Sequence, residues 1–171
     1  MKGAEIRQLI ERDPFVLFHF DGVFARDSLI NIHRQQHFVI ANVQKQSESG
    51  SHWIWIGRSN DTLEYCDPLG SRGNAENLQL VLDNKSILKD ISDLVISQDQ
   101  YQPLDSVDCG LFCVYVAYHR LYRLHQPFSH VLSRIFTSDP ISNEARVGEF
   151  VRQLEQQQQQ QQRQDDSTAR P

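Results

Sequence analysis

One stretch, residues 102–119, constrains the fold and the chemistry of this 171-residue chain more than any other. It begins with turn-forming residues and changes at Cys109-Gly110 into a run that is apolar almost all round, Leu-Phe-Cys-Val-Tyr-Val-Ala. A run of this length is typical of a buried helix, so we expect a central helix from Cys109 to about residue 124. A cysteine in the first turn of such a helix lies at the positive end of the helix dipole, which favours its thiolate form.

Three other residues could complete a catalytic site around this cysteine. His52 begins an apolar strand-like segment, and Asp67 follows a second one, residues 62–66. If the two segments pair as a hairpin, we expect Asp67 to hold the Nδ1–H of His52 and leave Nε2 facing the thiol. Gln102, seven residues before Cys109, could then complete an oxyanion hole with the backbone N–H of the cysteine.

The motifs around these four residues resemble a known family. They are His52-Trp, Asp67-Pro-Leu-Gly, and Gln102 followed by Cys109-Gly-Leu-Phe-Cys. In this order they are similar to the adenovirus-type cysteine proteases (adenain), to their relatives in Polinton/Maverick transposons and virophages, and to the wider clan of SUMO-specific proteases. The likeness extends from about residue 5 to residue 150. It implies His52 as base, Asp67 as its partner, Gln102 as oxyanion donor and Cys109 as nucleophile. Asp67 stands where the human adenovirus enzymes have a glutamate.

The resemblance implies a cysteine endopeptidase that cleaves capsid or core precursor proteins at small-residue, often glycine-containing, sites during virion maturation. Two alternatives stay open: a protease that removes SUMO-like or ubiquitin-like tags, and an inactive binding module on the same fold. The chemistry itself requires no cofactor, although adenain is stimulated by a disulfide-linked peptide and by DNA. Residues 71–108 contain no cysteine, which argues against a disulfide-linked peptide here.

Composition restricts the partners and the location that we expect. The formal net charge of −5 argues against a strongly electrostatic nucleic-acid binder, and leaves only a weak DNA contact through basic clusters at residues 26–34 and 119–125. No apolar run reaches the ~18 residues of a membrane span, and the N-terminus is too polar for a signal peptide. Three cysteines do not suit a disulfide framework. We therefore expect a monomeric protein that is neither secreted nor bound to membranes. Its expected location is intracellular, in the host nucleus or cytoplasm, or inside virions.

The order of elements predicts an α+β fold, with the central helix packed on a mainly antiparallel sheet. The papain-like architecture that the resemblance implies has the same order, except that here the histidine precedes the cysteine. We expect a protease domain over residues 1–154 and a disordered tail over residues 155–171, which contains seven consecutive glutamines. The segments expected before the tail are helices at 5–12, 75–82, 128–136 and 143–154, strands at 15–20, 37–43, 52–56, 62–66 and 91–97, and an irregular connection or short helix at 24–32.

Other side chains have simpler interpretations. Cys66 and Cys113 are expected to be small core residues. A zinc site formed by Cys109, Cys113 and His119 is disfavoured, because His119 does not share a helix face with Cys113. Asp108 is expected to cap the central helix.

The two tryptophans and the remaining histidines are interpreted mainly as packing or surface residues. Trp53 and Trp55 alternate along one strand and share a face, either as core residues or with Trp53 as a wall of the catalytic cleft. The other histidines are interpreted as structural or surface residues; they are His19, His33, His37, His119, His125 and His130.

Overall fold

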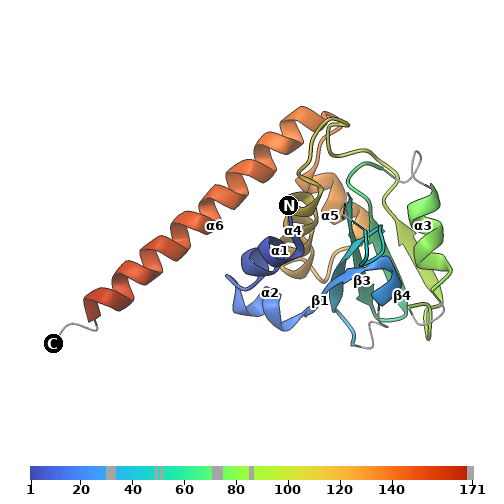
Figure 1. The fold of residues 1–171 in the computed structure, drawn as a ribbon, viewed down its shortest axis with the longest axis horizontal. Helices are drawn as coiled ribbons and strands as arrows, with labels where there is room; N and C mark the ends of the chain where they lie inside the picture. The colour runs from blue at the N-terminus through green and yellow to red at the C-terminus, as the bar shows by residue number, and fades with distance from the viewer. Residues whose placement is uncertain (30–33, 49, 51, 71–74, 85–86, 169–171) are drawn as a thin grey trace.

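The computed structural model describes residues 1–29, 34–48, 50, 52–70, 75–84 and 87–168, and its fold is α+β. Its five strands form one sheet in the order β1-β2-β3-β4-β5. Helices α1, α4 and α5 lie on one side of the sheet and α3 on the other (Figure 1). In chain order the elements are α1 (Gly3–Ile10), α2 (Pro14–Phe18), β1 (Phe20–Ala25), the 3-10 helix η1 (Arg26–Ser28), β2 (Phe38–Asn42), β3 (Trp53–Ser59), β4 (Thr62–Cys66), α3 (Ala75–Leu82), β5 (Asp93–Ile96), α4 (Cys109–Leu121), α5 (Phe128–Ile135) and α6 (Pro140–Thr168).

The sheet is mixed, so the expectation of a mainly antiparallel sheet was wrong. β2, β3 and β4 pair antiparallel, whereas β1 pairs parallel with β2 and β4 pairs parallel with β5. Parallel neighbours need a connection of a dozen or more residues. Residues 26–37 and 67–92 supply two such connections, and the second of them contains α3.

Both faces of the sheet are covered, and the side chains of the strands alternate between two cores. The larger core, on the side of α4, includes Phe38 and Trp55. The smaller core, on the side of α3, includes Val39, Ile56 and Val81. Because β2 and the first part of β3 are buried throughout, a polar side chain just beyond either strand can be held out of water.

The central helix begins at the expected cysteine. α4 runs from Cys109 to Leu121 and packs against β3, α1, α5 and α6. A Cβ atom on Gly110 would lie 2.7 Å from the sulfur of Met1 and 3.1 Å from Cδ1 of Ile6. Glycine at this position therefore lets the N-terminal segment approach the first turn of α4.

The segment at residues 15–20, expected to be a buried strand, is mostly helical. α2 begins at Pro14, and the side chain of Asp13 accepts hydrogen bonds from the N–H groups of Phe15 and Val16. A capping aspartate followed by proline in the first turn favours a helix over the β propensity of the aromatic residues. Phe18 is 68% exposed, whereas Val16 is fully buried, so the segment is buried on one face only.

The C-terminal tail is helical up to Thr168, which corrects the expectation of disorder from residue 155 onward. The first part of α6 packs on the larger core through Phe150, Val151 and Leu154. The glutamines continue this helix, and glutamine is a good helix former. The last turns extend away from the rest of the molecule (Figure 1).

Some expectations lie partly outside the described residues. The predicted connection over 24–32 contains η1, but residues 30–33 are not described, and neither is the predicted loop 71–74. Within the described part of the chain, no helix is long and apolar enough to cross a membrane.

A buried ion pair joins α4 to the sheet. The guanidinium of Arg120 donates from Nε and Nη2 to both carboxylate oxygens of Glu64 on β4, each at 2.7 Å. Its Nη1 donates to the carbonyl oxygens of Arg123 and Gln126, which follow α4. Both side chains of the pair are almost fully buried, so neither charge has water to replace its partner.

We predict that Arg120→Met will lower the free energy of unfolding by about 3 to 5 kcal/mol, because it leaves the Glu64 carboxylate buried and unpaired. Urea unfolding measures this change. The double variant Glu64→Leu/Arg120→Met should recover most of the loss, since it removes both charges. If the double variant were as unstable as Arg120→Met, the loss of stability would not come from an unpaired Glu64 carboxylate.

Candidate active site

The β3–β4 hairpin brings His52 and Asp67 to the same end of the sheet, as predicted. The two strands pair antiparallel with Trp55 opposite Cys66. Their connection turns at Asn60, whose φ of 58° lies in the left-handed region that asparagine tolerates. His52 immediately precedes β3 and Asp67 immediately follows β4, so the hairpin alone fixes their proximity.

The imidazole of His52 is hydrogen-bonded to Asp67 through the opposite nitrogen from the one expected. Its Nε2–H donates to Oδ1 of Asp67 at 2.7 Å. The expected role of Nδ1 was therefore wrong, because strand pairing fixes where the backbone lies and not how the ring turns on its side chain. Nδ1 is therefore not engaged by Asp67, and the side chain of Cys109 lies near enough to the ring to help raise the pKa of His52.

The Asp67 carboxylate is fully buried and accepts three hydrogen bonds. Besides the bond from His52, Oδ1 accepts one from the backbone N–H of Leu69 at 2.9 Å. Oδ2 accepts one from Nδ2 of Asn77, on α3, at 3.1 Å. A buried carboxylate is costly unless donors of this kind surround it, and these three bonds fix the orientation of Asp67.

The surroundings of His52 favour its protonated form. Burial lowers the pKa of His52, but its hydrogen bonds to Asp67 and Cys109, together with the charges of both, raise the pKa to about 9. At neutral pH the ring is thus an imidazolium between a carboxylate and a sulfur atom.

Gln102 is tied to the segments that carry the other site residues. Its backbone N–H donates to the carbonyl oxygen of Pro68, next to Asp67, at 2.9 Å. Its side-chain Nε2 donates to the carbonyl oxygen of Ser106, in the loop before Cys109, at 2.8 Å. One of the two amide hydrogens is therefore engaged by the loop; the side chain is almost fully buried, and its Oε1 has no hydrogen-bond partner among the described residues.

A tight turn holds Asp67 against the loop that leads to Gln102. Gly70 has a φ of +83°, and a Cβ atom there would lie 3.1 Å from the backbone nitrogen of Gln100. Its N–H donates to the carbonyl oxygen of Asp67 at 2.9 Å. The glycine of the Asp-Pro-Leu-Gly motif is thus required by both the backbone conformation and the close approach of the loop.

Asp108 occupies the N-cap position of α4, but its side chain makes no capping hydrogen bond, contrary to expectation. The bonds at this helix end leave its first N–H groups alone: the Asp108 N–H donates to the hydroxyl of Ser106, and the Asp108 carbonyl accepts from the N–H groups of Leu111 and Phe112. The first N–H groups of α4, beside Cys109, are therefore not capped by a carboxylate.

The other two cysteines belong to the core, as predicted. Cys66 and Cys113 are free and almost fully buried. Burial raises the pKa of both thiols, so neither forms a thiolate at neutral pH. Among the described residues, no group of three or more histidine, cysteine or acidic side chains could hold a metal ion.

Two further histidines have surroundings that the sequence did not indicate. Nδ1 of His37 and Oδ1 of Asp21 lie 2.9 Å apart, at the end of the sheet opposite His52. Burial, aided by the nearby charge of Arg123, lowers the pKa of His119 to about 4. His119 is thus a neutral, partly buried residue, consistent with the structural role expected for it.

Trp53 has the first of the two roles considered for it, that of a core residue, and the cavity that it lines contains none of the four candidate site residues. It packs in the larger core next to Trp55, and its Nε1–H donates to the carbonyl oxygen of Met1 at 3.2 Å. It also lines a cavity of about 400 Å³ together with Met1, Gly3 and Val23. The N-terminal segment therefore lies between Trp53, which follows His52, and Gly110, which follows Cys109.

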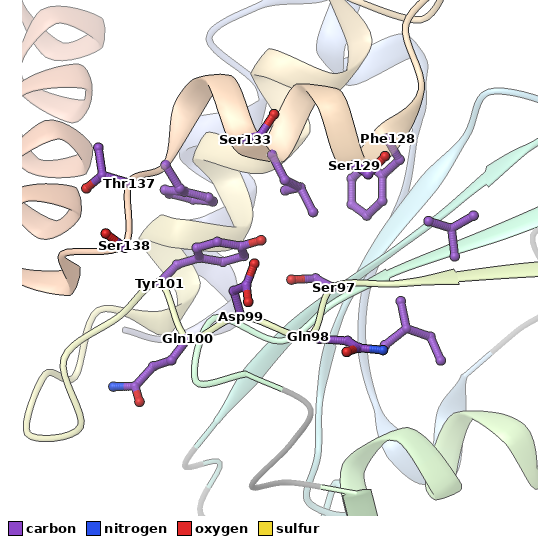
Figure 2. Close-up of a pocket in the computed structure, with 14 residues that line it drawn as sticks. Ser97, Gln98, Asp99, Gln100, Tyr101, Phe128, Ser129, Ser133, Thr137 and Ser138 are labelled. Carbon is purple, nitrogen blue, oxygen red and sulfur yellow. The ribbon is translucent and has the colours of Figure 1, made fainter.

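A larger cavity of about 710 Å³ lies between β5 and α5. Figure 2 shows Ser97 and Asp99 on one side of it and Phe128 and Ser133 on the other, with Tyr101 beside them. β5 is the last strand of the sheet, so the cavity adjoins an open strand edge.

Comparisons with known proteins leave the family of the chain open. No known protein family matches the sequence, and no curated protein matches it either. A solved structure with a similar arrangement is the central domain of an uncharacterized protein from Legionella pneumophila. It is 17% identical, with a TM-score of 0.46 over 79% of this chain and 88% of that one.

We predict that Asp67→Asn will make the protein less stable than the wild type, and that this difference will depend on pH. The raised pKa of His52 stabilises the fold fully below its ordinary pKa of 6.5, and this contribution is lost as pH rises through about 9. The difference in the free energy of unfolding should therefore be about 3 kcal/mol larger at pH ~6 than above pH ~9.

Urea unfolding at a series of pH values measures this effect. Asp105→Asn removes an exposed carboxylate and should show no comparable trend between these pH values. A difference between wild type and Asp67→Asn that stays constant from pH ~6 to ~9 would show that Asp67 does not hold the imidazolium.

Proposed function

We propose that this protein is a cysteine endopeptidase of the adenovirus type, with Cys109 as nucleophile and His52 as general base. One observation carries the proposal: a buried imidazole is hydrogen-bonded to a fully buried carboxylate, and its pKa is raised in part by a cysteine at the start of a helix. This arrangement meets the requirements of a nucleophile, a base and an orienting group.

The reaction follows from the positions of the two ring nitrogens. In the resting pair, Nδ1 of His52 holds the proton that the Cys109 thiol has given up, while Asp67 accepts from Nε2–H and stabilises the imidazolium. The thiolate attacks the carbonyl carbon of a peptide bond and forms a carbon–sulfur bond. The imidazolium then protonates the leaving amine as the carbon–nitrogen bond breaks, which leaves a thioester. Water, deprotonated by the same nitrogen, hydrolyses the thioester and releases the thiol.

Two donors could stabilise the oxyanion of the tetrahedral intermediate. The backbone N–H of Cys109 lies in the first turn of α4, which the Asp108 side chain leaves uncapped. The second candidate is the amide hydrogen of Gln102 that does not engage Ser106. Each donor of this type is typically worth about 3 kcal/mol of transition-state stabilisation.

The fold supports the papain-like part of the proposal. A central helix begins with the cysteine and packs on a sheet whose strand ends carry the histidine and its acidic partner. The resemblance of the motifs implies that the substrates are capsid or core precursors, cleaved at small-residue sites during virion maturation inside the host cell. Access to Cys109, which is 4% exposed, favours substrates with small side chains at the scissile bond.

The activating peptide that the resemblance implies would bind at the open edge of β5 in this proposal. The cavity there is lined by apolar side chains of α5 and by hydroxyl groups, which suits an extended segment added as a further strand (Figure 2). Such a peptide would be held without a disulfide, because Cys66 and Cys113 are almost fully buried. The net charge of −5 allows DNA only a weak part in activation.

We predict that Cys109→Ala and His52→Ala will each abolish cleavage of a co-expressed capsid precursor, because each removes a member of the reacting pair. His130→Ala, which replaces an exposed histidine, should cleave normally. Mapping of new N-termini in the precursor by mass spectrometry measures cleavage and reads out the sequence around the scissile bond. Undiminished processing by either active-site variant would reject the proposal.

Alkylation tests the nucleophile without a substrate. We predict that iodoacetamide at pH ~6, where ordinary thiols are protonated, will modify Cys109 and spare Cys66 and Cys113. His52→Ala should lose this reactivity, because the cation beside the sulfur is removed. Modification of Cys109 no faster than that of free cysteine would favour the inactive binding module over any protease.

A second probe separates the two kinds of protease. A ubiquitin-like or SUMO-like protein ending in a Gly-Gly electrophile should label Cys109 strongly only if the protein removes such tags. Weak labelling by this probe, combined with rapid alkylation by iodoacetamide, is the result expected for the endopeptidase.

A further inference from the structure

The side chain of Asn77 reaches the candidate site from the far side of the sheet. Asn77 lies in the first turn of α3, which begins at Ala75 and is anchored to the smaller core by Val81 and Leu78. Its Nδ2 donates to Oδ2 of Asp67 at 3.1 Å. The amide therefore links α3 to the carboxylate that holds His52.

The geometry points to Asn77 as a positioning residue that fixes the Asp67 carboxylate, and through it the orientation of His52. This inference rests on the proposed function for its catalytic meaning, but the contact that it concerns can be tested alone. Asn77 would not touch the substrate or the reacting sulfur, and it would act through Asp67.

The two oxygens of the carboxylate are held in different ways. Oδ1 accepts from His52 and from the backbone of Leu69, in the turn that follows Asp67. The bond described for Oδ2 comes from Asn77, on a separate element. Two points of attachment define the plane of a carboxylate, whereas one point leaves it free to rotate about its last bond. Asp67 is fully buried, so bulk water does not readily replace a lost donor.

The helix itself does not account for this asparagine. Asparagine is a poor helix former compared with its neighbours in α3, such as leucine and glutamine. It is the third residue of the helix and not its N-cap, and its amide donates away from α3 towards Asp67. The residue type is thus explained by the buried acceptor that it faces.

The first test uses Asn77→Ala, which removes the donor and keeps helix propensity high. The readout is the proton NMR signal of the His52 Nε2–H in protein labelled with ¹⁵N-histidine, because this proton lies in the bond to Asp67. We expect the signal to broaden or disappear, and alkylation of Cys109 at pH ~6 to slow by about tenfold, as for other residues that orient a functional histidine. Gln79→Ala, an exposed amide of the same helix, should change neither.

The second test uses Asn77→Asp, which keeps the shape of the side chain and makes the interaction depend on pH. At pH ~5.5 the two neighbouring carboxyl groups share a proton, and the introduced O–H donates to Asp67 as the amide did. At higher pH both ionise and repel. We therefore expect the His52 signal of this variant to match the wild type at low pH and to be lost as pH rises, while Asn77→Ala lacks the signal throughout.

The outcomes separate this inference from the proposed function. An unchanged His52 signal in Asn77→Ala, or equal losses in both variants at every pH, would overturn the positioning role, since disturbed packing of α3 does not depend on pH. Absence of Cys109 alkylation in the wild type would instead reject the protease, while the NMR comparison still tests the contact with Asp67. If Asn77→Ala does not fold, Asn77→Asp at low pH still provides the test.

Discussion

The buried charge of Asp67 is the constraint on which the site depends. A carboxylate that is out of contact with water must be surrounded by donors, or it becomes protonated. Its three donors come from three separate elements: His52 before β3, Leu69 in the turn after β4, and Asn77 on α3. The hairpin, the turn and the helix must therefore all be in place before this charge is stable. The same requirement fixes the orientation of the imidazole.

The two layers of helices contribute to the site in different ways. On one side, α4 supplies Cys109 at its N-terminus, and the packing of its first turn against the N-terminal segment depends on Gly110. On the other side, α3 supplies the donor that completes the bonds to Asp67. Histidine and aspartate lie between the layers, at strand ends that the buried sheet keeps rigid. The candidate site is thus a junction of both helical layers and not a feature of one loop.

The parts that the sequence predicts well are those with local signals. The hairpin, the bounds of α3 and the start of α4 follow from residue patterns within a few positions, and the convergence of His52 and Asp67 follows from the hairpin. The parallel pairing of β1 and β5 was missed because it depends on contacts between distant segments. The helix α2 was missed because aromatic residues suggested a strand, although Asp13-Pro14 is a local signal that indicates a helix.

The details within the site lie beyond sequence patterns. The choice between the two ring nitrogens of His52 is a matter of one side-chain torsion. The contact between Asn77 and Asp67 joins residues ten positions apart, with an undescribed loop between them, and no motif marks it. The prediction for Asp108 failed because residue type favours a cap, whereas in the structure its side chain makes no capping bond and Ser106 pairs only the Asp108 N–H.

The charges around Cys109 give a physical reason why the Asp108 side chain does not cap α4. When His52 is an imidazolium and Cys109 a thiolate, the site holds one cation between two anions, and Asp67 is fully buried. The surplus negative charge is offset by neutral donors to Asp67 and by the positive end of α4 beside the sulfur. A capping carboxylate from Asp108 would occupy the same N–H groups and repel the thiolate. Leaving the helix end uncapped costs about 1 kcal/mol of helix stability. Under the proposed function, those donors would be free for an anion that forms on the sulfur or on a bound carbonyl oxygen.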